Sequence, residues 1–88
     1  MKKEKAIYIG EPIKQLRNAT GMFQEEFAYC CKLDRSYMSD LETNKKSPSL
    51  MTINKLAGGL GMKAEDLVAE LGKTIDFARI FEEEPYKN

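Results

Sequence analysis

The hydrophobic positions of this chain recur three and four residues apart, which is the spacing of one face of an α-helix. Ile13 and Leu16 follow this spacing just after a proline, a residue that a helix tolerates only in its first turn. The pattern predicts a first helix that begins near Gly10 or Glu11. Gly21 is its expected end, because glycine readily takes the left-handed conformation that terminates a helix.

Residues 24–44, QEEFAYCCKLDRSYMSDLETN, carry two short helical patterns separated by a turn. Asp34 is a good N-cap for the second of these helices, and Asn44 suits a left-handed end. Phe23, by contrast, stands at the N-cap of the first and has no side-chain acceptor, so capping energy of about 1 kcal/mol is missing there. The expected inward side chains of the two helices are Phe27, Ala28, Cys31, Met38 and Leu41.

Two further helices are predicted after the loop at residues 45–49. Ser49 caps the first of them, and Gly61 ends it. Within it, Gly58 and Gly59 weaken the helix by roughly 1 kcal/mol each and would permit close packing against a neighbour. The last helix runs from about residue 64 to residue 71. The sequence therefore predicts an all-α fold, a compact five-helix bundle over residues 9–71.

The two ends of the chain fall outside this bundle. Residues 1–8 are predicted to be a basic N-terminal arm, and residues 72–88 a C-terminal tail with a dimerisation or interaction role. Thr74 could cap a short helix in the tail, yet TIDFARIF is also β-prone. A second interpretation is that residues 7–9 and 75–80 pair as strands or pack together in a dimer.

Length and charge limit the function. A chain of 88 residues forms one domain without an enzyme-sized cleft. The net charge is zero, but residues 1–55 hold ten Lys/Arg against seven Asp/Glu (+3), and residues 56–88 hold four against seven (−3). The N-terminal part could thus face a polyanion. No apolar run approaches the roughly 20 residues of a membrane span, and no export signal is evident, so we expect a cytoplasmic protein.

The adjacent cysteines, Cys30 and Cys31, do not indicate a metal site. Neighbours in a helix point about 100° apart, which makes a disulfide between them geometrically poor. The chain has no histidine, so it lacks both a second zinc ligand set and the commonest general base. We expect a buried Cys31 beside a more exposed Cys30, no metal or cofactor, and no enzymatic activity.

The outward face of the helix after Asp34 carries the candidate chemistry. Arg35, Ser36, Ser39 and Asp40 have no place in the core, and a helix that projects such side chains suits the base edges of a DNA major groove. Arg35 is the leading base reader, because arginine binds guanine O6 and N7 in a bidentate manner. Asp40 would repel phosphate and accepts only from a donor such as cytosine N4. It is a reader, an exclusion device or merely solvated.

These segments together resemble the helix-turn-helix domain of the phage-repressor and Cro (XRE-type) family. The resemblance rests on IGEPIKQLRNATGM, on residues 24–44, and on KKSPSLMTINKLAGGLGM, and it covers residues 9–71. Within the family, GMFQEEFAY and LDRSYMSDLE are similar to the controller proteins of restriction–modification systems. The resemblance implies a lambda-repressor-like fold and a sequence-specific transcriptional regulator that binds a two-fold-related operator as a dimer.

The resemblance also implies roles for individual residues. Base reading falls to Arg35, Ser36, Ser39 and Asp40, and phosphate binding to Gln24, Tyr37, Asn44, Lys45 and Lys46; Tyr37 could instead be half-buried against the preceding helix. Arg17 and Glu42 match an ion pair that ties the first helix to the third. Dimerisation through the fourth and fifth helices and the tail would involve Leu60, Met62, Val68, Leu71 and Ile75.

One departure from the family pattern concerns the turn. Lys32 stands where the family commonly has glycine. Either its φ is positive, at a cost of roughly 1–2 kcal/mol, or the turn has a different shape.

The expected partners are double-stranded DNA and a second copy of the chain, without a membrane or a small-molecule ligand. The rival hypothesis is a protein-interaction module, such as an antitoxin that masks its partner with the acidic, aromatic residues 75–86.

Overall fold

The computed structural model describes residues 6–84, which contain six α-helices and no β-strand. The five helices predicted for residues 9–71 are confirmed. The first five elements fall where the hydrophobic pattern placed them, and the sixth lies in the tail. The helices are α1 (Gly10–Thr20), α2 (Gln24–Cys30), α3 (Arg35–Glu42), α4 (Leu50–Leu60), α5 (Ala64–Leu71) and α6 (Phe77–Glu83).

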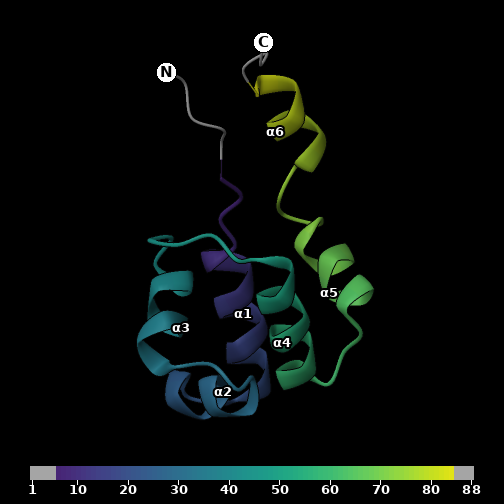
Figure 1. Cartoon of the computed structure of the whole chain (residues 1–88). Helices are drawn as coiled ribbons and strands as arrows, with labels where there is room; N and C mark the ends of the chain where they lie inside the picture. The colour runs from purple at the N-terminus through teal and green to yellow at the C-terminus, as the bar shows by residue number, and fades with distance from the viewer. Residues whose placement is uncertain (1–5, 85–88) are drawn as a thin grey trace.

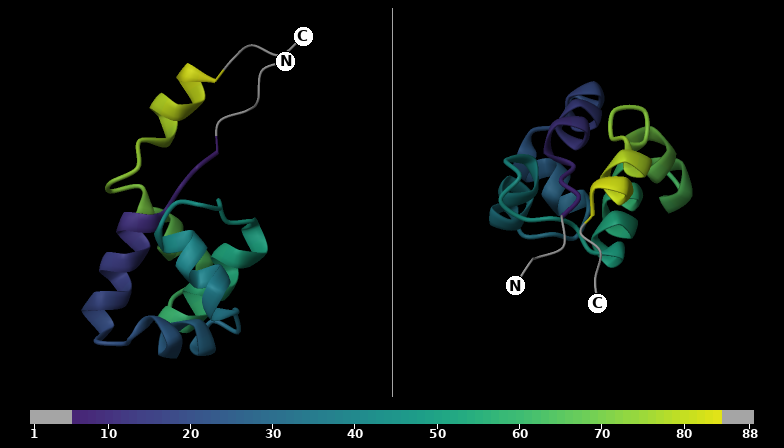
Figure 2. Two further views of the ribbon diagram at one scale, coloured as in Figure 1. Left: turned by 90° about the vertical axis from the view of Figure 1, so that its left-hand side faces the viewer. Right: turned by 90° about the horizontal axis from the view of Figure 1, so that it is seen from above.

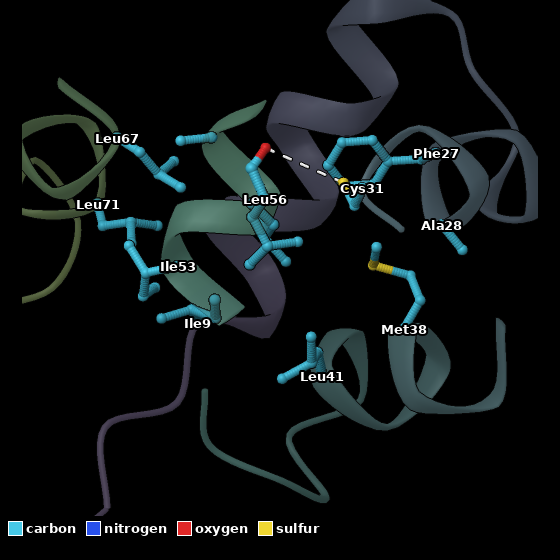
Figure 3. Packing of buried hydrophobic residues seen from close by; sticks show 12 residues of the cluster. Ile9, Phe27, Ala28, Cys31, Met38, Leu41, Ile53, Leu56, Leu67 and Leu71 are labelled. Atoms are coloured by element: carbon cyan, nitrogen blue, oxygen red, sulfur yellow. Dashed lines mark hydrogen bonds between the residues drawn. The ribbon is translucent and has the colours of Figure 1, made fainter. Parts of the chain in front are cut away.

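Helices α1 to α5 pack around one hydrophobic core, with α2 across one end of the bundle and α6 standing away from the opposite end (Figure 1; Figure 2). The core draws fully buried side chains from each part of the bundle, among them Phe27 of α2, Met38 and Leu41 of α3, and Leu56 of α4 (Figure 3). Burying a side chain of this size stabilises the fold by about 1.5–3 kcal/mol. Because α3 is anchored through its inner face, its outer face has a fixed orientation.

The helix ends follow the predicted caps. Gly21 ends α1 with a φ of 78°, and Asn44, just beyond α3, has a φ of 61°. The carboxylate of Asp34 accepts from the backbone amide two residues further on, and the hydroxyl of Ser49 from the amide three residues further on. These contacts satisfy backbone groups that a helix end leaves unpaired.

The start of α2 compensates for its poor N-cap residue. Phe23 offers no side-chain acceptor, as predicted, but its backbone amide donates to Oε1 of Glu26 at 3.0 Å. That contact is one half of the reciprocal capping box. Local pairing thus recovers part of the missing capping energy.

The turn between α2 and α3 contains Lys32 with a φ of 58°. The sequence left open whether Lys32 has a positive φ or the turn has a different shape, and the positive φ is correct. A side chain with a Cβ is strained there by roughly 1–2 kcal/mol.

Gly59 allows α4 to approach α2 closely, as the glycine pair predicted, whereas Gly58 faces open space. A methyl group at Gly59 would collide with Sγ of Cys31, and it would lie 3.2 Å from the Cys31 backbone nitrogen. Cys31 is buried and Cys30 exposed, again as expected. Burial raises the pKa of the Cys31 thiol to about 11. The thiol therefore acts as a small apolar group in the core.

The tail differs from the strand interpretation. Residues 7–9 have no regular structure, residues 77–83 form α6, and the described part of the chain has no strand. The cap of this helix is Asp76, whose Oδ1 accepts from the Arg79 amide at 3.0 Å, rather than Thr74. An ion pair at 3.1 Å between Arg79 and Glu83 supports the helix one turn on. Residues 1–5 of the predicted arm and residues 85–88 of the tail lie outside the described residues.

Candidate nucleic-acid interface

The outer face of α3 and the start of α2 form one shallow hollow. Its volume is about 350 Å³, and its lining is Gln24, Arg35, Ser36, Ser39 and Asp40. Arg35 and Ser36 are exposed, and the other three are partly exposed. The structure therefore brings the four candidate base readers together with Gln24 on a single surface.

An ion pair beneath this surface joins α1 to α3. Nε of Arg17 donates to Oε2 of Glu42 at 2.7 Å, and Nη2 donates to Oε1 at 3.0 Å. Nη1 donates to the backbone carbonyl of Met22 at 2.9 Å, next to the start of α2. The hydrogen bond with Glu42 raises the pKa of Arg17, so the guanidinium stays charged although it is buried. This pair fixes α3 relative to α1.

Gln24 belongs to the same network. Its amide Nε2 donates to Oε1 of Glu42 at 3.1 Å. The orientation of the Gln24 amide is thereby set by a carboxylate of α3, and its second N–H remains for another acceptor. The residue stands at the first position of α2, where backbone amides and the helix dipole also favour an anion.

The loop after α3 folds back onto the last residues of that helix. The backbone carbonyl of Asp40 accepts from the amides of Lys45 at 2.8 Å and Lys46 at 3.3 Å. The Asp40 carboxylate lies 3.5 Å from Nζ of Lys46, while both lysines are exposed. The loop therefore presents its positive charges beside the polar face of α3.

Tyr37 is half-buried, and its hydroxyl reaches α4. Its hydroxyl shares a hydrogen bond of 3.1 Å with Oγ1 of Thr52. Nζ of Lys46 lies 5.6 Å from the centroid of its ring, within the range of a cation–π contact. The tyrosine thus links α3 to α4 and supports one loop lysine.

Asn44 has a structural contact that the sequence did not reveal. Its Oδ1 accepts from the backbone amide of Gly10 at 2.9 Å and so caps the start of α1. The preceding residue, Ile9, has no side-chain acceptor for this purpose. A methyl group at Gly10 would collide with the same Asn44 oxygen. The missing cap at Ile9 was the only signal in the sequence, and it did not identify the acceptor.

The residues predicted for a dimer interface have different environments. Leu71 is only 2% exposed and lies in the core of its own subunit, so it is unsuited to a contact with a second copy. Val68 is 41% exposed. The remaining three residues, half-buried at the edge of the core, are Leu60, Met62 and Ile75.

The fold and its polar face define a helix-turn-helix domain, in which α3 is the helix available to the major groove. Residues 9–71 match the helix-turn-helix domain family, and the chain belongs to that family. It is a DNA-binding transcriptional regulator of the XRE/Cro type, and not an enzyme.

The proteins that this chain resembles include controllers of restriction–modification systems. Control protein C.MunI from a Mycoplasma species is 37% identical over 68 residues, which are 76% of this chain and 92% of that protein. Control protein C.BamHI from Bacillus amyloliquefaciens is 35% identical over 63 residues, which are 70% of this chain and 78% of that protein. The crystal structure of the restriction–modification controller protein C.AhdI from Aeromonas hydrophila superimposes with a TM-score of 0.63 at 37% identity, covering 67% of this chain and 89% of that one.

The described residues contain neither a membrane-spanning helix nor a cluster of metal ligands. No helix within residues 6–84 is long and apolar enough to cross a bilayer. In the same residues, no group of three or more His, Cys, Asp or Glu side chains is arranged to hold a metal ion.

Proposed function

We propose that this protein is a controller-type regulator that acts in the cytoplasm as a homodimer on a two-fold-related operator. The observation that carries the proposal is the shared hollow of α2 and α3, in which Arg35, Ser36, Ser39 and Asp40 lie beside Gln24 on a rigidly supported helix. A rigid support matters because base readout requires side chains to be held in register with base edges. Similarity to C.MunI, C.BamHI and C.AhdI supports the controller assignment.

In this proposal the hollow reads bases and its margins hold the backbone. Arg35 is the principal reader, with the two serines and Asp40 within the same groove. Phosphates on either side of the hollow are contacted by the second N–H of Gln24, the accessible edge of Tyr37, Asn44, Lys45 and Lys46. Phosphate contacts fix register without carrying sequence information, whereas base contacts specify the site.

The operator can be identified by selecting bound duplexes from random DNA. Enrichment of a motif with two half-sites about one helical turn apart, roughly 34 Å, would support the proposal. The same experiment rejects it if the full-length protein enriches no two-fold-related motif. A methyltransferase or endonuclease gene beside the coding sequence would further support a restriction–modification role, whereas a neighbouring toxin gene would favour the antitoxin alternative.

Arg35 can be tested separately on the selected operator. Arg35→Ala should weaken operator binding by about 1–3 kcal/mol and relax the preference at one base position. Arg79→Ala is the matched control, because it removes an equal charge from α6, away from the hollow. Equal losses of the Arg35 variant on operator and scrambled DNA would exclude a base-reading role.

We propose that the dimer forms through the face that contains Leu60, Met62, Val68 and Ile75. Val68 is 41% exposed beside a groove of about 420 Å³ whose lining also includes Ile7, Pro48 and Phe77. An apolar groove of this kind loses unfavourable contact with water when a second copy covers it. Leu71 supports the groove from the core.

Sedimentation equilibrium of two α5 variants tests this interface. Val68→Glu should shift the protein from dimer to monomer. Ala69→Glu, the adjacent exposed position, adds the same charge and should leave the dimer intact. A dimer that survives Val68→Glu with unchanged affinity would exclude this face.

A further inference from the structure

Asp40 is the acidic residue among the five that line the hollow. Its carboxylate Oδ2 lies 3.5 Å from Nζ of Lys46, with 29% of the Asp40 side chain and 58% of the Lys46 side chain exposed. Each group is thus open to water and to an approaching DNA duplex. In the free protein, the positive charge of Lys46 is directed to a carboxylate on the reading helix.

The backbone maintains this arrangement. The carbonyl of Asp40 accepts from the amides of Lys45 and Lys46, at 2.8 and 3.3 Å, so the loop is anchored to the same residue whose carboxylate faces Lys46. The centroid of the Tyr37 ring lies 5.6 Å from the Lys46 ammonium nitrogen, and the Tyr37 hydroxyl shares a hydrogen bond of 3.1 Å with Oγ1 of Thr52. The Lys46 ammonium therefore has two neighbours, the Asp40 carboxylate and the Tyr37 ring.

Lys45 differs from its neighbour. It is exposed on the same loop, yet it forms no ion pair within residues 6–84. A DNA phosphate can bind Lys45 without displacing a protein group. To bind Lys46, it must compete with Asp40.

Because of this competition, the contact between Lys46 and a phosphate depends on the DNA sequence. When Lys46 moves to a phosphate, Asp40 loses its counter-charge beside a polyanion, which is electrostatically unfavourable. A base that offers an N–H, such as the N4 amine of cytosine, can replace the lost partner of the carboxylate. Where no such donor stands opposite Asp40, the carboxylate keeps Lys46 and repels the DNA.

We propose that Asp40 is a specificity-determining residue that withholds Lys46 from phosphates except at sites that offer Asp40 a hydrogen-bond donor. This inference rests on the proposed function, because it requires α3 in a major groove and the loop lysines near phosphates. By withholding Lys46, Asp40 lowers the affinity of this chain, whose net charge is zero, for random DNA. The two lysines would then have different effects on specificity.

Binding of full-length variants to the selected operator and to a scrambled duplex of equal length tests the proposal. Asp40→Asn keeps the shape and removes the charge, and we expect it to raise affinity for the scrambled duplex by about two- to fivefold while lowering the operator-to-scrambled ratio. The dependence of log affinity on log salt should steepen there by about 0.9, corresponding to one more phosphate contact. Lys46→Gln should reduce operator affinity more than scrambled affinity, whereas Lys45→Gln, the matched control, should reduce both equally.

With Asp40→Asn in place, Lys46→Gln should reduce affinity for both duplexes alike. If the wild-type protein binds neither duplex, the proposed function fails. If it discriminates between them, but Lys45→Gln and Lys46→Gln act identically and Asp40→Asn leaves the ratio unchanged, the DNA-binding function stands and this inference is overturned.

Discussion

Glu42→Gln is expected to destabilise the fold strongly, because it removes the counter-charge of a buried arginine. The Glu42 carboxylate accepts from Nε and Nη2 of Arg17 and from Nε2 of Gln24, at 2.7, 3.0 and 3.1 Å. The side chains of Glu42 and Arg17 are only 2% and 11% exposed. Breaking a buried pair on one side costs about 3–5 kcal/mol. Since glutamine keeps one acceptor oxygen, we expect the lower end, about 3 kcal/mol.

That loss is large for a domain of this size. At about 0.05–0.15 kcal/mol per residue, a chain of 88 residues has a free energy of unfolding of roughly 4–13 kcal/mol. A loss of 3 kcal/mol corresponds to a fall in Tm of about 12–24 °C. Urea and thermal unfolding followed by circular dichroism measure both quantities.

A second variant separates charge from packing. Arg17→Leu combined with Glu42→Leu removes both charges, and buried pairs replaced by apolar residues are often neutral or more stable. The double variant should therefore regain more than half of the stability lost by Glu42→Gln. If the free energy of unfolding of Glu42→Gln is within about 1 kcal/mol of the wild-type value, the buried guanidinium does not depend on the charge of this carboxylate, and the expectation is refuted.

Three other expectations follow from single contacts. Gly59→Ala should lower the free energy of unfolding by about 1–3 kcal/mol, because the added methyl group collides with Cys31. Gly58→Ala, which faces open space, should raise it by about 0.5–1 kcal/mol. Equal effects of the two variants in urea unfolding would contradict the close packing of α4 on α2. Lys32→Gly should raise the urea midpoint by relieving a φ of 58°, and a lower midpoint would argue against strain. At pH 8 a thiol reagent should label the exposed Cys30 at once and the buried Cys31 only on unfolding. The thiolate is the reactive form, and the pKa of Cys31 is raised to about 11. Simultaneous labelling of the two cysteines would exclude a closed core.

The sequence predicted local structure correctly where a residue's effect depends only on residues close to it in the chain. The helical spacing of Ile13 and Leu16, the caps at Asp34 and Ser49, and the left-handed end at Gly21 were all readable in this way. Each depends on groups within about four residues. The tail was ambiguous for the same reason, since the eight residues of TIDFARIF have both helical and β-prone features and do not fix one local structure.

The sequence by itself thus determined the helix order, the inner and outer faces of α3, and the family over residues 9–71. Only the tertiary structure decided which distant groups meet: the Asn44 oxygen at the start of α1, the Tyr37 hydroxyl at α4, and Lys46 beside Asp40. It also placed Leu71 in the core instead of at a surface. The physical reason is that hydrophobic periodicity records which way a residue faces, whereas a hydrogen bond or ion pair between elements depends on ångström-scale distances set by packing.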